Sequence, residues 1–187
     1  AEGCTIGSPK DEEGRRADEP ERRVSFGADI QMMRGELTQA RWAQVWRDAA
    51  TVSPDRYGLP IAPSFFIGDP LPVEGVSWCD AARFANLRTQ VELEGVAPAY
   101  TVTTTGADDN PYALAGCETG AEIQWDRAST AWRLPTEAEW EVAARGGDHS
   151  GRWWPGEESD LLAAEWLGSN ADWRTHAACT APGASAH

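Results

Sequence analysis

The chain lacks the features that mark several common classes of protein. No apolar run reaches the roughly 18 residues of a membrane-spanning helix, so none is expected. Lys and Arg number 16 against 30 Asp and Glu, and the net charge of −14 argues against nucleic acid and anionic membrane as partners, because both attract clustered positive charge. The chain opens without a basic and apolar leader, so we expect a protein that is either cytosolic or already processed.

Metal-binding and redox motifs built on histidine and cysteine are also missing. Only three histidines are present, and two of them lie in a Gly- and Ala-rich terminal region, so a histidine metal centre is not expected. The absence of a CxxC pair disfavours zinc fingers and redox pairs. Two interpretations of the cysteines stay open: two disulfides in an exported protein, or buried free thiols. In both, the cysteines are structural, and they are Cys4, Cys79, Cys117 and Cys179.

Tryptophan, by contrast, is abundant. The chain has 187 residues, which suits one domain, and 41% of them are hydrophobic, enough for a sizeable core. Ten residues are tryptophans, whose rings either fill a loop-rich core or line a binding surface. The adjacent pair Trp153 and Trp154 is the best candidate for an exposed platform. One of the two is a candidate to contact a ligand or partner, because neighbouring side chains of an extended chain face opposite ways.

Three segments have the apolar spacing of short amphipathic helices. The first, residues 39–50, follows the capping residue Thr38. The second follows Ser77, and Asp80 stands at the capping-box position three residues on. The third is residues 137–145. The side chains that we expect to face inward are Trp42, Val45, Trp46 and Ala49 in the first helix and Trp78, Ala81, Ala82 and Ala85 in the second.

The third helix has strong capping signals. Thr136 and Glu139 have the spacing of a capping box, in which each side chain accepts from the other's backbone N–H. Trp140 lies on the apolar stripe, so we expect its ring in the core. Glu141 and Arg145 form an i, i+4 ion pair of the favourable polarity. Thr136, Glu139 and Trp140 are therefore expected to be structural residues.

Strand-like patterns are short and scattered. Residues 23–38 alternate loosely, and residues 71–78 and 122–126 form two further strand-like runs. Residues 51–70 hold four prolines and two glycines and are expected to form a loop. Short helices and short strands set among long loops predict an α+β fold with much irregular structure.

Four stretches match one known pattern in order along the chain. They are "TIGSPKDEEGRRADEPERRV", "GELTQARWAQV", "PVEGVSWCDAARFANL" and "RLPTEAEWEVAARGG", which we call the signature stretches. Together they resemble the formylglycine-generating enzyme (sulfatase-modifying factor) family. The resemblance is strongest over residues 5–147. It reports the fold rather than the chemistry, and four ordered matches are far more specific than any one of them.

The resemblance implies a fold and a location. Members of this family have an irregular α+β domain related to C-type lectins, so we expect a single such domain over residues 1–187, with residues 174–187 as a weakly ordered tail. Members are very often exported, which implies a periplasmic or secreted protein here. The wide spacing of the cysteines is compatible with that location.

A departure from the family pattern decides the functional expectation. Segments like "NxxGLxDMxGNVWEW" and "RGGSW", which family members carry after this point, are not found here. In the active oxidases of the family, the copper-binding cysteine pair and most structural calcium ligands lie in that late region. We therefore expect no catalytic residue in this chain, and a non-catalytic binding or assembly domain. The alternative is part of a copper-dependent oxidase that converts a peptidyl cysteine to formylglycine, with its metal site supplied by another segment.

Cofactors and partners follow from the same reasoning. Oxygen ligands gather at Asp108, Asp109 and Asn110, with Glu118 nearby, and could bind calcium, although turn chemistry explains the same residues. Copper is expected only if the catalytic segment comes from elsewhere. The expected partner is a protein or peptide, which includes a separate C-terminal chain or a second copy.

Overall fold

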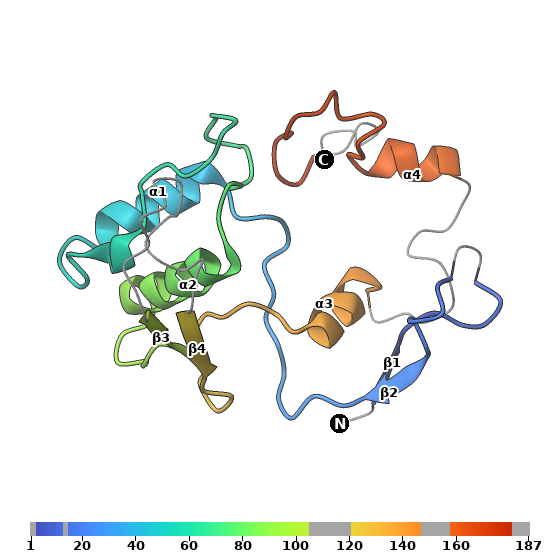
Figure 1. Cartoon of the computed structure of the whole chain (residues 1–187), viewed down its shortest axis with the longest axis horizontal. Helices are drawn as coiled ribbons and strands as arrows, with labels where there is room; N and C mark the ends of the chain where they lie inside the picture. Colours follow the sequence, from blue (N-terminus) through green and yellow to red (C-terminus); the bar gives the residue numbers. More distant parts are fainter. Residues whose placement is uncertain (1–2, 13–14, 105–120, 147–157, 181–187) are drawn as a thin grey trace. The chain divides into compact units, whose positions relative to one another are not determined.

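The computed structural model describes residues 3–12, 15–104, 121–146 and 158–180 (Figure 1). The contacts divide the chain into two compact units, each of which joins segments that are far apart in the sequence. The central unit comprises Gly35–Leu134 and Ala171–Thr180. The terminal unit comprises Ala1–Arg34, Pro135–Asn170 and Ala181–His187.

The described part of the central unit contains two helices, one short turn of 3-10 type and a two-stranded sheet. The helices are α1 (Gln39–Asp48) and α2 (Trp78–Glu92), and the turn is η1 (Arg56–Gly58). Strands β3 (Tyr100–Thr104) and β4 (Ala121–Trp125) pair antiparallel along their full length. The predicted strand at residues 122–126 is thus confirmed within one residue, whereas its partner β3 was not predicted.

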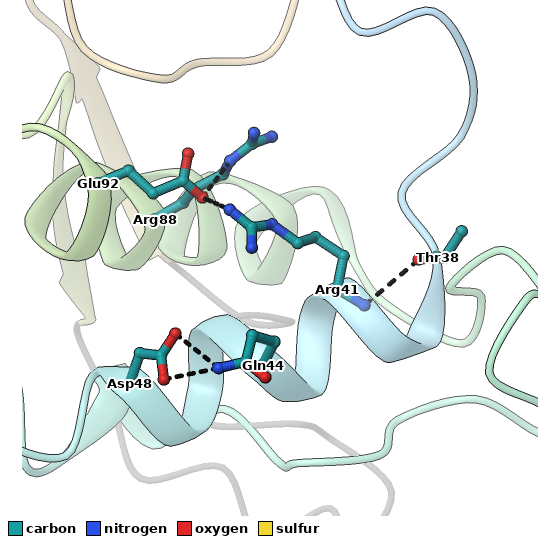
Figure 2. Close-up of polar contacts among 6 residues, drawn as sticks. All are labelled: Thr38, Arg41, Gln44, Asp48, Arg88 and Glu92. Atoms are coloured by element: carbon teal, nitrogen blue, oxygen red, sulfur yellow. Dashed lines mark hydrogen bonds and ion pairs between the residues drawn. The ribbon is translucent and has the colours of Figure 1, made fainter.

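Local capping begins both helices where the sequence predicts. The hydroxyl of Thr38 accepts from the backbone N–H of Arg41 at 3.3 Å (Figure 2). The Ser77 hydroxyl accepts from the Asp80 N–H at 3.1 Å, and the Asp80 carboxylate accepts from the Ser77 N–H at 3.0 Å. The second helix therefore starts with a complete capping box.

The core of the central unit forms where α1 meets α2. Trp42 and Phe84 stack with ring centroids 4.1 Å apart and planes 6° from parallel. The indole N–H of Trp42 donates to the carbonyl of Pro60 at 2.9 Å, which satisfies the one polar atom of a ring that is 2% exposed. Residues buried around this pair are Val45, Ala49, Leu59 and Leu87.

A shared carboxylate also joins the two helices. The Glu92 carboxylate accepts from Arg41 of α1 and from Arg88 of α2, both at 2.8 Å (Figure 2). Arg88 in turn lies over the ring of Trp132, 3.7 Å from its centroid. This arrangement adds charge-assisted contacts beside the apolar core.

The described part of the terminal unit contains only short helices and strands. Strands β1 (Cys4–Ile6) and β2 (Arg22–Val24) pair antiparallel, and the helices are α3 (Glu137–Ala144) and α4 (Glu158–Ala164). Helix α3 opens with the predicted capping box: Thr136 and Glu139 exchange hydrogen bonds of 2.8 and 3.2 Å.

Four predictions about this architecture are wrong in whole or in part. Residues 23–38 form a strand only at their start, where Val24 ends β2, and residues 71–78 form no strand. Trp140 is 48% exposed rather than buried, and Trp78 is 59% exposed. In α3 the buried residue is Glu139, because its carboxylate turns back to the helix start. The apolar spacing of Trp140 shows which helix face it shares, but not how deeply that face packs.

The predicted fold class is confirmed. Short helices and short paired strands are connected by long irregular segments, which is an α+β arrangement. Within the described residues, no helix is both long and apolar enough to cross a membrane.

Candidate functional site

In the terminal unit, two signature stretches contact each other through Gly7. Its backbone N–H donates to Glu141 Oε1 at 2.8 Å, and Arg145 donates to its carbonyl at 3.4 Å. The predicted ion pair between Glu141 and Arg145 is confirmed at 3.0 Å. Gly7 has φ +87°, and a Cβ there would overlap the Pro20 carbonyl. These signature residues therefore clamp a backbone turn; they build the scaffold.

In the central unit, the second signature stretch clamps a loop through Gln39. Its Nε2 donates to the carbonyls of Phe66 at 2.7 Å and Pro72 at 3.1 Å. Its Oε1 accepts from the Gly68 N–H at 3.1 Å. One amide side chain therefore fixes three backbone groups of residues 60–75, which we call the apolar loop.

The third signature stretch begins inside the same loop, and its Glu74 ties the loop to itself. Glu74 accepts from the Phe66 N–H at 2.8 Å, and the Glu74 N–H donates to the Ser64 hydroxyl at 3.1 Å. Gly75 has φ +72°, and a Cβ there would press on the carbonyl of Pro63 at 3.0 Å. The backbone of the apolar loop is thus tied at several points, to Gln39 outside the loop and to Glu74 within it.

The side chains that this loop presents are large and apolar. Phe65 is 82% exposed and Ile67 is 75% exposed, while Phe66 between them is partly buried. The two phenylalanine rings meet edge to face with centroids 5.1 Å apart. Single exposed apolar residues are common, but two on one fixed loop suit contact with another molecule.

A second exposed ring lies on residues 171–180 of the same unit. Trp173 is 87% exposed, and both Asp172 and Trp173 have left-handed backbone, with φ of 51° and 55°. Such a conformation is unusual for a bulky residue and is retained only where surrounding contacts enforce it. A hydrogen bond joins this segment to the apolar loop: the Ala178 N–H donates to the Pro70 carbonyl at 2.9 Å.

One titrating group with a perturbed pKa lies near the start of the apolar loop. Burial raises the pKa of the Tyr57 hydroxyl, the charge of Asp55 raises it further, and a hydrogen bond from Gln90 partly offsets both. The Gln90 Nε2 lies 3.0 Å from the Tyr57 oxygen. Tyr57 has φ 54°, so side-chain contacts hold a strained backbone here as well.

The cysteines differ from both interpretations of the sequence. Cys4 and Cys179 are free thiols, and Cys179 is exposed, so the interpretation with two disulfides is wrong. Cys79 is buried and disulfide-bonded. Cys117 lies outside the described residues. Over the part of the chain that the structure describes, no group of three or more His, Cys, Asp or Glu residues could hold a metal ion.

Several predicted site residues fall outside the described residues. These are the tryptophan pair Trp153 and Trp154 and the calcium candidates Asp108, Asp109, Asn110 and Glu118. The apolar loop, in turn, was not predicted as a site. The signal was present in the run Phe65–Ile67, which lies between prolines in a segment expected to be a loop. An apolar run at the centre of a proline-rich loop cannot be explained as a helix face or a strand face.

Comparisons with known proteins agree with the signature stretches. The family model for the sulfatase-modifying factor enzyme 1-like domain matches residues 3–185. A relative from Paenibacillus barcinonensis, named chaperone protein LppX, is 33% identical over 128 residues, which is 66% of this chain but only 38% of that relative. No solved structure matches the chain. Because the family model covers nearly the whole sequence, the chain belongs to the family of sulfatase-modifying factor enzyme 1-like domains.

Proposed function

We propose that this chain is a non-catalytic protein-binding domain and that the apolar loop is its binding surface. The observation that carries the proposal is that the backbone of the loop is held in place while its large apolar side chains are exposed. Gln39 and Glu74 fix the loop backbone, whereas Phe65 and Ile67 remain largely exposed to water. A loop that served only to connect α1 to α2 would not need a fixed backbone together with exposed apolar side chains.

The energetics support binding of an apolar segment. Covering a large apolar side chain that is exposed in the free protein contributes about 1.5–3 kcal/mol. Two such side chains on one loop contribute about 3–6 kcal/mol toward an association cost of roughly 4–15 kcal/mol, so other contacts with the partner supply the rest. Because Gln39 already fixes the loop in the free protein, little further ordering of the loop opposes binding.

The comparisons supply a second line of support. The relative from Paenibacillus barcinonensis carries the name of a chaperone, and chaperones bind exposed apolar segments of other proteins. The family alone does not decide the function, because one fold serves many functions. We also propose an extracytoplasmic location, which the disulfide-bonded state of Cys79 supports, since disulfides persist in oxidising compartments.

An aggregation assay tests the proposal. Citrate synthase diluted out of guanidinium chloride aggregates, and light scattering follows it with and without this protein. We expect the wild-type chain to suppress scattering and the variant with both Phe65→Ser and Ile67→Ser to lose that effect. Val52→Ser is the matched control, because Val52 is an exposed apolar residue of the same unit outside the apolar loop. Equal suppression by all three proteins, or none by the wild type, would refute the proposal.

The oxidase alternative is tested in parallel. The reduced protein is titrated with Cu(I) against a competing chelator and incubated with a cysteine-containing peptide. Tight one-to-one copper binding, together with an aldehyde on the peptide, would replace the binding-domain proposal, because a thiolate copper site needs at least two sulfurs held close together. The proposal predicts neither result.

A further inference from the structure

We infer that the segment bound by the apolar loop is cationic as well as apolar. This inference rests on the proposed function and adds the chemistry of the partner. Its basis is the charge of the loop and its flanks: residues 57–82 contain no Lys, Arg or His. The charged residues of that stretch are all acidic, and they are Asp69, Glu74 and Asp80.

These three carboxylates differ in how accessible they are to a bound cation. Asp80 is 1% exposed and caps α2, and Glu74 is partly buried and accepts from the Phe66 N–H. Asp69 is exposed and follows Ile67 by two residues. Its backbone carbonyl accepts from the Ala40 N–H at 3.1 Å, so its position is fixed on the first turn of α1. Asp69 is therefore the carboxylate of the loop that a bound cation can reach.

Arg56, which precedes the stretch, and Arg41 of α1 are engaged elsewhere, and Arg83, which follows the stretch, is buried. Arg56 lies over the Trp46 ring at 4.2 Å and donates to two backbone carbonyls. Arg41 pairs with Glu92 at 2.8 Å. The neighbouring segment 171–180 carries Asp172 and Arg174, whose charges offset each other. Among the described residues no ion pair involves Asp69 or Glu74, so their negative charge lies near the exposed Phe65 ring within a chain of net charge −14.

A segment with alternating apolar and basic side chains matches this surface in two ways. Its apolar side chains cover Phe65 and Ile67. A lysine or arginine beside them reaches Asp69 and the exposed face of the Phe65 ring, which attracts cations through its quadrupole. An acidic segment of equal apolarity meets like charge instead, and like charges disfavour association.

Peptide titrations with a fluorescent label test the inference on the full chain. The probes are an amphipathic peptide of leucine and lysine, the same peptide with glutamate in place of lysine, and the same peptide with serine in place of leucine. We expect the leucine–lysine peptide to bind at least about tenfold more tightly than each of the others. Phe65→Ser with Ile67→Ser should abolish its binding, and Val52→Ser should not.

A charge variant with a matched control tests whether Asp69 is the carboxylate that attracts the cationic peptide. Asp69→Asn should weaken binding of the leucine–lysine peptide about two- to fivefold and reduce its salt dependence. Asp48→Asn removes an equal charge at the other end of α1, nine residues or roughly 13 Å from Gln39, and should leave binding unchanged.

The outcomes separate this inference from the proposed function. If the lysine and glutamate peptides bind equally and both need Phe65, the loop is a binding surface without charge preference and the inference is overturned. If neither peptide binds, the proposed function fails. If the lysine peptide binds equally well without Phe65 and Ile67, attraction to the overall charge explains it and both ideas are overturned.

Discussion

The side chain of Gln39 donates to the backbone carbonyl of Phe66 at 2.7 Å, next to the exposed ring of Phe65. Gln39→Ala should therefore leave three backbone groups of the loop without their partner and cost about 1–3 kcal/mol of unfolding free energy. Urea titration measures this cost. Hydrogen exchange at Gly68, whose N–H donates to Gln39, should also accelerate.

Gln44→Ala is the matched control for that change. Gln44 is an exposed glutamine of the same helix, and it bonds only the Asp48 side chain (Figure 2). Its removal should change stability by less than about 0.5 kcal/mol. If the two alanine variants had equal stability and equal hydrogen exchange, the loop would not depend on Gln39.

Glu141 makes a testable contact in the terminal unit. Glu141→Ala removes the acceptor of the Gly7 N–H and the partner of Arg145, whose side chain is almost fully buried, so it should cost about 1–3 kcal/mol. Glu137→Ala in the same helix removes an exposed ion pair with Arg22 and should cost at most about 1 kcal/mol. Denaturant titration measures the loss of stability in both variants. A larger loss for Glu137→Ala than for Glu141→Ala would contradict the role of Glu141 in holding Gly7.

Two tryptophans of the central unit should differ sharply in how much stability is lost when each is replaced by alanine. Trp42→Ala removes a buried ring that stacks on Phe84, and should cost about 3–5 kcal/mol. Trp78→Ala removes a ring that is more than half exposed, and should cost clearly less. Thermal unfolding followed by circular dichroism compares them, and equal losses would show that the core does not centre on Trp42.

Alkaline pH should destabilise the central unit through Tyr57. Burial raises the pKa of its hydroxyl, so the folded state holds the phenol proton more tightly than the unfolded chain does. This contribution to stability is complete below the ordinary tyrosine pKa of about 10 and is lost as pH rises through the higher folded pKa. Tyr57→Phe should lose less stability between neutral and strongly alkaline pH, and an identical pH profile would exclude this role for Tyr57.

Thiol counting tests the assigned states of the cysteines. Under denaturing, non-reducing conditions the chain should show two reactive thiols, which peptide mapping places at Cys4 and Cys179. Before denaturation, Cys179 should react with a maleimide, because its side chain is exposed. Four thiols would contradict the disulfide-bonded state of Cys79 and weaken the proposal of an oxidising location.

The parts of the structure that sequence predicts correctly depend on local spacing. The caps at Thr38, Ser77 and Thr136 need only residues three positions away, so they were predicted correctly. The contact between Gly7 and Glu141 spans 134 residues, and no spacing rule reports it. The spacing that predicts the Glu141 ion pair does not show that the pair also holds the backbone turn at Gly7, which follows β1.

The depth of burial of helix residues and the conformation of the apolar loop could not be predicted from the sequence. A helical stripe shows which residues share a face, but it does not show how deeply that face packs, and Trp140 was misplaced for this reason. The apolar loop has no helical or strand period. Its exposed side chains Phe65 and Ile67 indicate a binding surface because Gln39 and Glu74 fix the backbone that carries them.

Photocrosslinking from the apolar loop tests directly whether this loop is the binding surface. Phe65 is replaced by benzoylphenylalanine, and the protein is illuminated in the presence of the leucine–lysine peptide. Position 52 carries the same group as a control, since Val52 is also exposed in the central unit. We expect a crosslinked peptide at position 65 and only background at position 52. Equal yields at both positions, or no product at position 65 while the peptide is bound, would contradict this expectation.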